Sequence, residues 1–465
     1  MDSIAAQTAV ASQPVGGALS TLIAACVSSF LFQFDLTALS AALPDIASSL
    51  SARVADQVWV IDVYSLALIF TLPLTGPLAD RYGRRRMFRT GAILFAIASV
   101  LCATATSFFG LLVWRVLQGV AGAALTASAA ALLAAAYPPP RRTWAFGIWG
   151  TVIGASMVLG PPLGALIAST PGLGWQWVFW SNIPICVALL VLIGRTTSDQ
   201  TISRKHTPLD WAGPATLALC VGSLAFLMLT DHGAEGTGVP TPVVLGGCLT
   251  ALALFIRIER RHVAPAFDFA LFGSSRFVAM CVVPIASSIG FWAILVHLPQ
   301  MARGAMALSP AATGLLLTAL TAPMLLLPSV GAKLAAKLPA RWFFAGGLGI
   351  VGGADLLLAL AARDFRAPLA IVVVVGALLI SGAGTAMFNA QITATAVSAV
   401  PPDRAATASA ISVTTRQIGF AFGIALIGAL LRSNGPSYTT ALAAVSALTL
   451  GLGGVAFVLL GRSGK

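Results

Sequence analysis

The sequence predicts an all-α polytopic membrane protein with fourteen transmembrane helices. Of its 465 residues, 58% are hydrophobic and only 9% are charged, whereas a soluble domain carries roughly 25% charged residues. Glycine and proline, with 45 and 26 copies, are more frequent in membrane helices than in soluble ones. The third observation is a series of long apolar runs separated by short basic loops.

A helix needs about 20 apolar residues to cross the hydrocarbon core of a bilayer. The runs that meet or approach this length are 18–43, 58–79, 90–108, 110–136, 143–169, 177–194, 211–230, 242–258, 277–301, 309–332, 342–362, 367–391, 405–431 and 438–460. Basic residues separate them in order. Five arginines lie between the second and third runs, two between the fourth and fifth, and three basic residues between the sixth and seventh.

The positions of the basic residues predict the topology. Every second loop and the C-terminal tail together hold 20 of the 27 Lys and Arg residues, while the opposite loops hold five. Because cytoplasmic loops carry the excess of Lys and Arg, we expect both termini in the cytoplasm and the chain in a bacterial inner (plasma) membrane. An odd number of spans would break this separation of charge.

A weak internal repeat predicts the domain organisation. "GPLADRYGRRR" at 76–86 follows the second run, and "AKLAAKLPAR" at 332–341 follows the tenth. Repeated halves with a site between them are the architecture of secondary transporters. We therefore expect a six-helix half at 1–195, two inserted helices with cytoplasmic linkers at 196–275, and a second six-helix half at 276–465.

Several classes of protein are excluded. The net charge of +12 lies in loops between apolar runs, so it predicts membrane topology rather than nucleic-acid binding. The six cysteines lie in six different runs without a CxxC or Cys/His cluster, so neither disulfides nor a metal site is expected. Walker A, HExxH and nucleophile-elbow sequences are missing. We expect no enzyme activity and no cofactor, and a transporter would draw its energy from ion gradients.

Three acids lie inside the predicted spans: Asp35, Asp62 and Asp355. An ionisable residue in a membrane helix is costly and is a candidate functional residue by default. Low-dielectric surroundings favour the neutral carboxyl group, so such an acid can carry a proton. The alternative is a structural role, as a helix cap or as the partner of an arginine.

Two arginines also lie inside spans. Arg115 shares a polar, small-residue face of its helix with Gln118, and it either tunes an acid or forms a permanent salt bridge. Arg416 shares a face with Ser412, and it either pairs with Asp355, binds an anionic substrate or has a structural role. Asn389 could hydrogen-bond a ligand or another helix.

The loop at 76–86 resembles the signature loop of the major facilitator superfamily. "RVLQGVAGAAL" at 115–125 is similar to its fourth-span motif, and "GASMVLGPPLGA" at 154–165 to its fifth-span antiporter motif. "FDLTALSAALPDI" at 34–46 and "WVIDVYSLAL" at 59–68 resemble the fourteen-span drug:proton antiporter branch, of the quaternary-ammonium-compound multidrug exporter type. Arg416 departs from that pattern, because those exporters often carry an acid there.

The resemblance implies roles for these residues. Proton coupling would involve Asp35, Arg115, Asp62 and Asp355. The substrate cavity would include Asp35, Asp62, Gln118, Asp355, Asn389, Ser412 and Arg416. A conformational latch would use Gly76, Asp80, Arg81, Gly83 and Arg84, although a solvated basic loop is the alternative. The antiporter motif comprises Gly154, Gly160, Pro161 and Gly164, which would seal the two halves against leak or simply pack helices closely.

The sequence therefore predicts a monomeric, proton-coupled multidrug efflux antiporter that exports hydrophobic, cationic compounds by alternating access. Its partners would be a small-molecule substrate, protons and the lipid bilayer, without nucleic acid or metal. An exporter of one natural product or metabolite, neutral or anionic and recognised by Arg416, is the closest alternative. A non-transporting membrane receptor is more remote.

Overall fold

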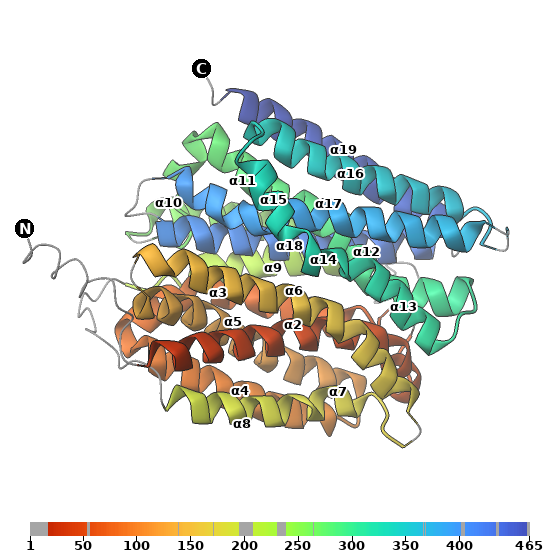
Figure 1. Cartoon of the computed structure of the whole chain (residues 1–465), viewed down its shortest axis with the longest axis horizontal. Helices are drawn as coiled ribbons and strands as arrows, with labels where there is room; N and C mark the ends of the chain where they lie inside the picture. Colours follow the sequence, from red (N-terminus) through yellow and green to blue (C-terminus); the bar gives the residue numbers. More distant parts are fainter. Residues whose placement is uncertain are drawn as a thin grey trace, which may run out of the picture.

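The computed structural model describes residues 17–53, 56–137, 139–170, 172–194, 208–229, 239–263, 265–365, 367, 369–400, 405–433 and 437–462. Within these ranges all regular structure is helical, and the helices run side by side along the long axis of the molecule (Figure 1). The expected boundary near residue 195 lies outside the described residues, so the predicted division into halves remains a prediction.

The first group of helices consists of α2 (Ala18–Ser49), α3 (Trp59–Tyr82), α4 (Arg84–Ala103), α5 (Phe108–Ala136), α6 (Pro139–Ser169), α7 (Gln176–Trp180) and α8 (Asn182–Ile193). Ser107 caps the N-terminus of α5, because its side chain accepts a hydrogen bond from Gly110 N at 3.1 Å. Between α3 and α4, Gly83 has a φ of 95°, which glycine adopts readily because it lacks a Cβ. Buried Leu31, Phe88 and Phe95 belong to the core of this group.

The second group consists of α11 (Ser275–Ser287), α12 (Ala293–Gln300), α13 (Pro310–Thr321), α14 (Pro323–Leu326), α15 (Pro328–Ala335), α16 (Ala340–Ala361), α17 (Ala370–Ser398), α18 (Ala405–Ser433) and α19 (Tyr438–Arg462). A 3-10 turn, η1 (Phe269–Gly273), precedes α11. The π-helical turns η2 (Ser288–Trp292) and η3 (Met301–Ala305) flank α12 within one continuous helical segment. Buried Phe344, Leu348 and Phe388 lie in the core of this group.

The run 309–332 is not one straight helix as expected. Residues Pro310–Leu326 and Pro328–Ala335 are bent by 47° relative to each other. Pro323 and Pro328 explain the break, because proline lacks the backbone N–H that would continue the helical hydrogen bonds.

Helices α9 (Ala212–Leu229) and α10 (Thr241–Arg261) lie between the two groups in sequence. Helix α9 packs on α10 and also touches α3 and α18, one helix from each group. The sulfurs of Cys220 and Cys248 lie 3.7 Å apart at the α9–α10 contact. The sequence shows each cysteine alone in its own apolar run. The packing of α9 on α10 brings these two thiols together.

Among the described residues, ten helices are long and apolar enough to cross a membrane, or eleven if the bent pair counts as one span. Shorter apolar stretches lie at Trp59–Thr75, Ile148–Gly164 and Ala212–Met228. The all-helical membrane architecture is therefore confirmed, whereas the fourteen-span count stays a prediction.

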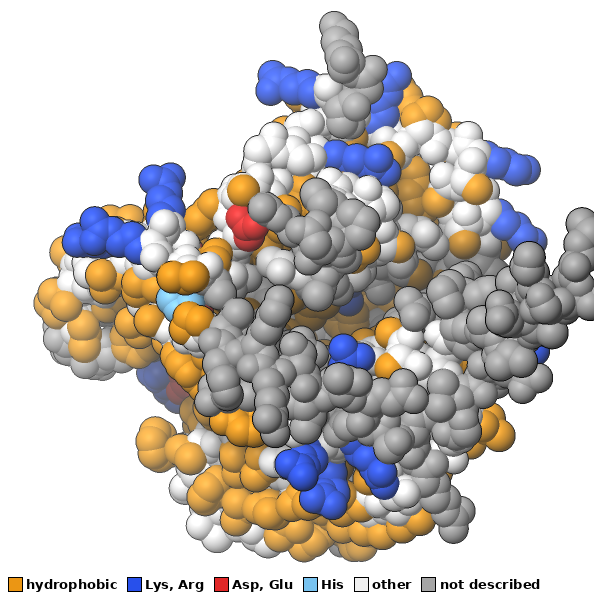
Figure 2. All heavy atoms as spheres, turned by 90° about the vertical axis from the view of Figure 1, so that its left-hand side faces the viewer, with side chains coloured by type: hydrophobic (Ala, Val, Ile, Leu, Met, Phe, Trp, Pro, Cys, Tyr) orange, Lys and Arg blue, Asp and Glu red, His pale blue; other side chains and the backbone are white. Residues whose placement is uncertain are grey.

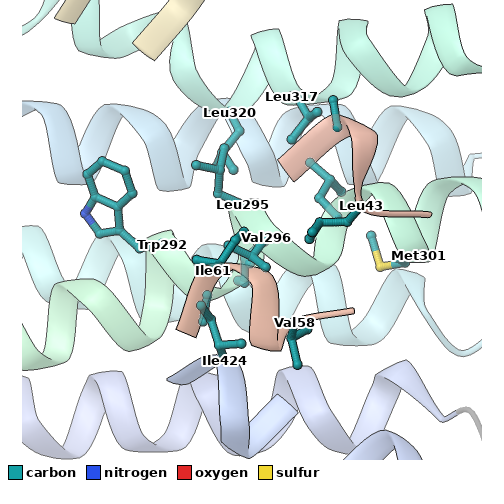
Figure 3. Close-up of a cluster of buried hydrophobic side chains, with 14 of the residues drawn as sticks. Leu43, Val58, Ile61, Trp292, Leu295, Val296, Met301, Leu317, Leu320 and Ile424 are labelled. Carbon is teal, nitrogen blue, oxygen red and sulfur yellow. The ribbon is translucent and has the colours of Figure 1, made fainter. Parts of the chain in front are cut away.

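The two ends of the bundle differ in character. Helix α2 begins and α19 ends at the same end, on the left of Figure 1. We call this the terminal end, and Figure 2 shows Lys and Arg side chains spread around it. At the opposite end the two groups meet in a buried apolar contact, which we call the apolar closure. Its residues include Leu43, Val58, Ile61, Leu295, Val296, Met301, Leu317, Leu320 and Ile424 (Figure 3).

Candidate functional site

Asp35 lies near the middle of α2 and is fully buried. Its Oδ2 accepts a hydrogen bond from Arg115 Nη1 at 2.7 Å, which is also a salt bridge between two side chains without solvent exposure. Its Oδ1 accepts hydrogen bonds from Asn182 Nδ2 at 2.8 Å and from Gln118 Nε2 at 3.2 Å. The carboxylate therefore has three donors from α5 and α8, which stabilise its ionised form.

Arg115 connects this carboxylate to α3. Its Nε donates to the Val60 carbonyl at 2.9 Å, and its Nη1 also donates to Gln118 Oε1 at 2.6 Å. The guanidinium carbon lies 4.3 Å from the centre of the Tyr64 ring, within cation–π range. Its Nη2 has no hydrogen-bond partner in the described part of the chain. One arginine thus joins an acid on α2 to the backbone of α3.

Two members of this network carried no assigned role in the sequence. Ser99 Oγ, on α4, accepts from Gln118 Nε2 at 2.9 Å and from Asn182 Nδ2 at 3.3 Å. Asn182 opens α8 and is fully buried. An amide in a membrane helix is a recognisable sequence feature, because it must find a hydrogen-bond partner on another helix. We call Asp35, Arg115, Gln118, Ser99 and Asn182 the Asp35 network.

Asp62 lies on α3, two residues after Val60, and is fully buried. Neither of its carboxyl oxygens has a hydrogen-bond partner among the described groups. Asp62 therefore lies near Val60, the residue of α3 that Arg115 binds, but it takes no part in the hydrogen bonds of the network.

Asp355 lies on α16 in the second group of helices, away from the Asp35 network. It is 1% exposed, and both of its carboxyl oxygens lack hydrogen-bond partners in the described ranges. Arg416, on α18, is half-buried and its Nε also lacks a partner. The expected alternative of an Asp355–Arg416 pair is therefore wrong for this conformation. Ser412 is buried one turn before Arg416, and Asn389 is half-buried on α17.

The signature loop lies at the terminal end, between α3 and α4. Arg84 Nη1 donates to the Ala131 carbonyl at 3.3 Å, and Arg85 Nη2 donates to the Gly194 carbonyl at 2.8 Å. These bonds join the loop to its own group of helices. Gly76, Asp80 and Arg81 lie in the last turns of α3, and their side-chain surroundings lie outside the described part. The latch therefore remains a prediction.

Three glycines of the antiporter motif allow α6 to approach other helices closely. A Cβ atom on Gly160 or Gly164 would overlap with Thr37 or Ala38 of α2. A Cβ on Gly154 would lie 2.7 Å from the Met324 carbonyl oxygen, on α14 of the second group. Pro161 lies in α6, but its side chain lies outside the described part. Gly160 and Gly164 thus permit close packing of α6 within the first group, whereas Gly154 permits a close contact between the two groups.

Comparison with known proteins places this geometry in a family of membrane transporters. The sequence pattern of the Major Facilitator Superfamily matches residues 25–274 and 280–465. The chain belongs to this superfamily, and it is a multi-pass membrane transporter rather than an enzyme.

Three curated relatives are named for drug resistance or export. Multidrug resistance protein Stp of Mycobacterium tuberculosis is 29% identical over 89% of this chain and 76% of its own length. The tetracenomycin C resistance and export protein of Streptomyces glaucescens is 30% identical over the same shares. Multidrug export protein EmrB of Escherichia coli is 27% identical over 89% of this chain and 80% of its own length.

Solved structures share the fold. A D-xylose–proton symporter matches with a TM-score of 0.68 at 14% identity, covering 95% of this chain and 97% of that one. The peptide transporter POT in complex with sulfate matches with a TM-score of 0.70 at 18% identity, covering 96% and 95%.

Proposed function

We propose that this transporter is a proton-coupled multidrug efflux antiporter, which exports hydrophobic, cationic compounds by alternating access. The names of the relatives Stp and EmrB support drug efflux. We further propose that the three shorter apolar helices complete fourteen spans, that both termini are cytoplasmic, and that the protein is a monomer of the bacterial inner membrane. The terminal end, with its exposed Lys and Arg, would then face the cytoplasm.

One observation carries the mechanism: Arg115 binds both Asp35 and the Val60 carbonyl. Val60 lies between Val58 and Ile61, which belong to the apolar closure. Protonation neutralises Asp35 and removes its charge-assisted bond to Arg115, which is about twice as strong as a neutral hydrogen bond. The link through Arg115 that holds α3 at the apolar closure then weakens. Protonation of Asp35 would thereby shift the equilibrium between the inward-facing and the outward-facing state.

The cycle follows from this linkage. With the closure intact and Asp35 ionised, the cavity would face the cytoplasm and accept a cation near Asp62. Opening of the closure would expose the cavity to the outside, where a proton on Asp35 would favour release of the cargo. The signature loop with Asp80 and Arg84 would latch the cytoplasmic side in that outward state.

The test is uphill efflux from proteoliposomes that contain the purified full-length protein, with ethidium as the probe cation and an imposed pH gradient. We expect Asp35→Asn to reduce gradient-driven efflux at least tenfold and to abolish proton release on ethidium binding. Asp56→Asn is the matched control, because Asp56 is an acid in a surface ion pair with Arg53. Undiminished uphill efflux by Asp35→Asn would overturn the proposal.

A second candidate is the export of one natural product, neutral or anionic. The half-buried Arg416 with its unpartnered Nε favours it, as does the 30% identity to the tetracenomycin C exporter. Thermal stabilisation of the protein by tetracenomycin C, but not by ethidium, would favour this candidate. Loss of that stabilisation in Arg416→Gln would assign the recognition to the guanidinium.

A further inference from the structure

We infer that α10 carries a binding site for an anionic phospholipid, with Arg257 and Arg261 at the headgroup and an exposed apolar stripe of the helix along an acyl chain. The site is distinct from the Asp35 network, because all of its residues belong to α10. It goes beyond the proposed function, since its occupation depends on no step of the transport cycle.

Helix α10 has the length of a membrane span but packs on one side only. Only 22% of the residues in its most apolar stretch are buried, against 78% in α2. Three- and four-residue spacing puts its buried residues on one face: Cys248, Ala251, Phe255 and Glu259. Helix α9 packs on that face. The exposed apolar side chains on the other sides of α10 therefore contact lipid when the protein is in a membrane.

One exposed stripe of α10 leads to a pair of arginines. Val243 and Leu254 are 62% and 45% exposed, and they share a face because eleven residues make about three helical turns. Arg257 and Arg261 follow Leu254 by three and seven residues and continue the same stripe. From Val243 to Leu254 the stripe is about 16 Å long, roughly half the thickness of the hydrocarbon core. An acyl chain within one leaflet can therefore lie along it while its headgroup reaches the arginines.

A surface depression lies where the stripe meets the arginines. Its described lining consists of apolar and basic side chains only: Leu254, Arg257, Ile258, Arg261 and His262. Glu259, in the same turn, does not belong to this lining. It is buried instead, and its Oε2 accepts a hydrogen bond from Phe267 N at 3.0 Å. The described lining of the depression therefore carries positive charge next to apolar surface.

The charges of Arg257 and Arg261 are available to a ligand. Both side chains are exposed, and neither has a hydrogen bond or an ion pair among the described residues. Arg260 differs, because its guanidinium carbon lies 6.0 Å from the centre of the Phe269 ring. A guanidinium binds phosphate through two parallel N–H donors. Arginines at the end of a membrane helix lie at the depth of the headgroups, where anionic lipids attract them.

The apolar part of the depression selects a lipid over a soluble anion. A free phosphate would use the arginines alone, whereas Leu254 and Ile258 line the same depression. A phosphate group that is joined to an acyl chain satisfies both parts. Phosphatidylglycerol has such a phosphate and a net negative charge. Phosphatidylcholine has the phosphate as well, but its quaternary ammonium group would be repelled by the two arginines.

The experiment is photo-crosslinking of the purified full-length protein in phosphatidylcholine nanodiscs. A trace of phosphatidylglycerol with a diazirine on one acyl chain is the probe, and mass spectrometry of the digested protein locates its adducts. We expect adducts within 243–262 to be at least about fivefold more abundant than with diazirine phosphatidylcholine of the same chains, because two guanidiniums attract the anionic headgroup. Excess unlabelled phosphatidylglycerol should compete for the site, whereas inorganic phosphate should not.

Charge variants assign the headgroup to the arginines. The double variant Arg257→Gln with Arg261→Gln should lower the adduct yield within 243–262 at least about fivefold. The double variant Arg257→Lys with Arg261→Lys keeps both charges and should retain most of the yield. Arg260→Gln is the matched control, because it removes a neighbouring charge that lies over Phe269 instead of beside the depression; it should behave as wild type.

A second pair of variants assigns the acyl chain to the stripe. Leu254→Ala removes apolar surface next to the arginines and should lower the adduct yield about twofold. Leu249→Ala is the matched control. Leu249 is 58% exposed and lies five residues before Leu254, so it is on another side of the helix, and its variant should behave as wild type.

Equal adduct yields within 243–262 for the two photoactive lipids would overturn the inference, because the site would not recognise the anionic headgroup. An equal loss of adducts in Arg260→Gln and in the double glutamine variant would overturn it as well, since net charge alone would explain the binding. Competition by inorganic phosphate would show a site for free anions only. None of these measurements uses drug efflux, so a failure of ethidium transport would refute the proposed function without affecting this test.

Discussion

At the scale of single residues, the first group of helices stabilises a buried charge pair and the second does not. Asp35 and Arg115 have no exposed surface, and four neutral hydrogen-bonding groups surround them. Removal of one partner from a buried pair leaves an uncompensated charge and typically costs about 3–5 kcal/mol. The pair therefore constrains α2, α3 and α5 as long as Asp35 is ionised.

Asn182 offers the cleanest test of that constraint, because it donates to Asp35 without carrying charge. We expect Asn182→Leu to lower the free energy of unfolding by about 1–3 kcal/mol, because the buried carboxylate loses one of its three donors. It should also reduce gradient-driven efflux severalfold, because Asp35 loses one of the three donors that position its carboxyl group. Ethidium efflux from proteoliposomes measures this loss. Ser181→Ala is the control, since that hydroxyl donates to the Val178 carbonyl of its own turn; undiminished efflux by Asn182→Leu would contradict the network.

At the scale of elements, α6 belongs to the first group of helices and also makes a close contact with the second. Its glycines meet α2 on one side, at Gly160 and Gly164, and α14 on the other, at Gly154. Small residues permit such backbone approaches, which drive helix association in membranes. The proline break between α13 and α15 lies at the same contact, where the Met324 carbonyl oxygen would lie 2.7 Å from a Cβ on Gly154.

Gly154→Ala should loosen the contact between the two groups. The new Cβ would lie 2.7 Å from a backbone oxygen, so α6 and α14 must move apart. We expect drug-independent proton leak through proteoliposomes to rise severalfold, with a pH-sensitive dye as the measurement. Gly150→Ala lies one turn earlier on α6, and its Cβ would meet nothing within 4 Å. Equal leak in the two variants would show that the seam does not depend on this contact.

At the scale of the whole molecule, the two groups are joined at the end opposite the termini. The apolar closure excludes water there, and Asp45 on α2 forms a two-bond ion pair with Arg303 on η3, with both distances at 3.0 Å. Their side chains are 30% and 29% exposed. A partly exposed pair contributes up to about 1 kcal/mol, whereas each fully buried leucine contributes several times more. The closure depends mainly on apolar burial, and the ion pair sets its alignment.

Arg303→Gln should therefore open this end only modestly. A loss of about 1 kcal/mol corresponds to roughly a fivefold change in the equilibrium. We expect up to that increase in the labelling rate of a cysteine placed at Val58 by a membrane-impermeant maleimide. The charge swap Asp45→Arg with Arg303→Asp should restore the slow rate. Failure of the swap to restore it would mean that the pair does not hold the two groups together.

The sequence by itself determined the all-helical membrane architecture, because apolar length and charge are properties of contiguous segments. It also located the intramembrane acids Asp35, Asp62 and Asp355, since a carboxyl group in an apolar run is conspicuous in one dimension. Only the tertiary structure decided which of them has a counter-charge. The partners of Asp35 lie 80, 83 and 147 residues away, and Arg303 lies 258 residues from Asp45. Such pairings depend on how helices rotate and pack against each other, which a pattern of hydropathy along the chain does not encode.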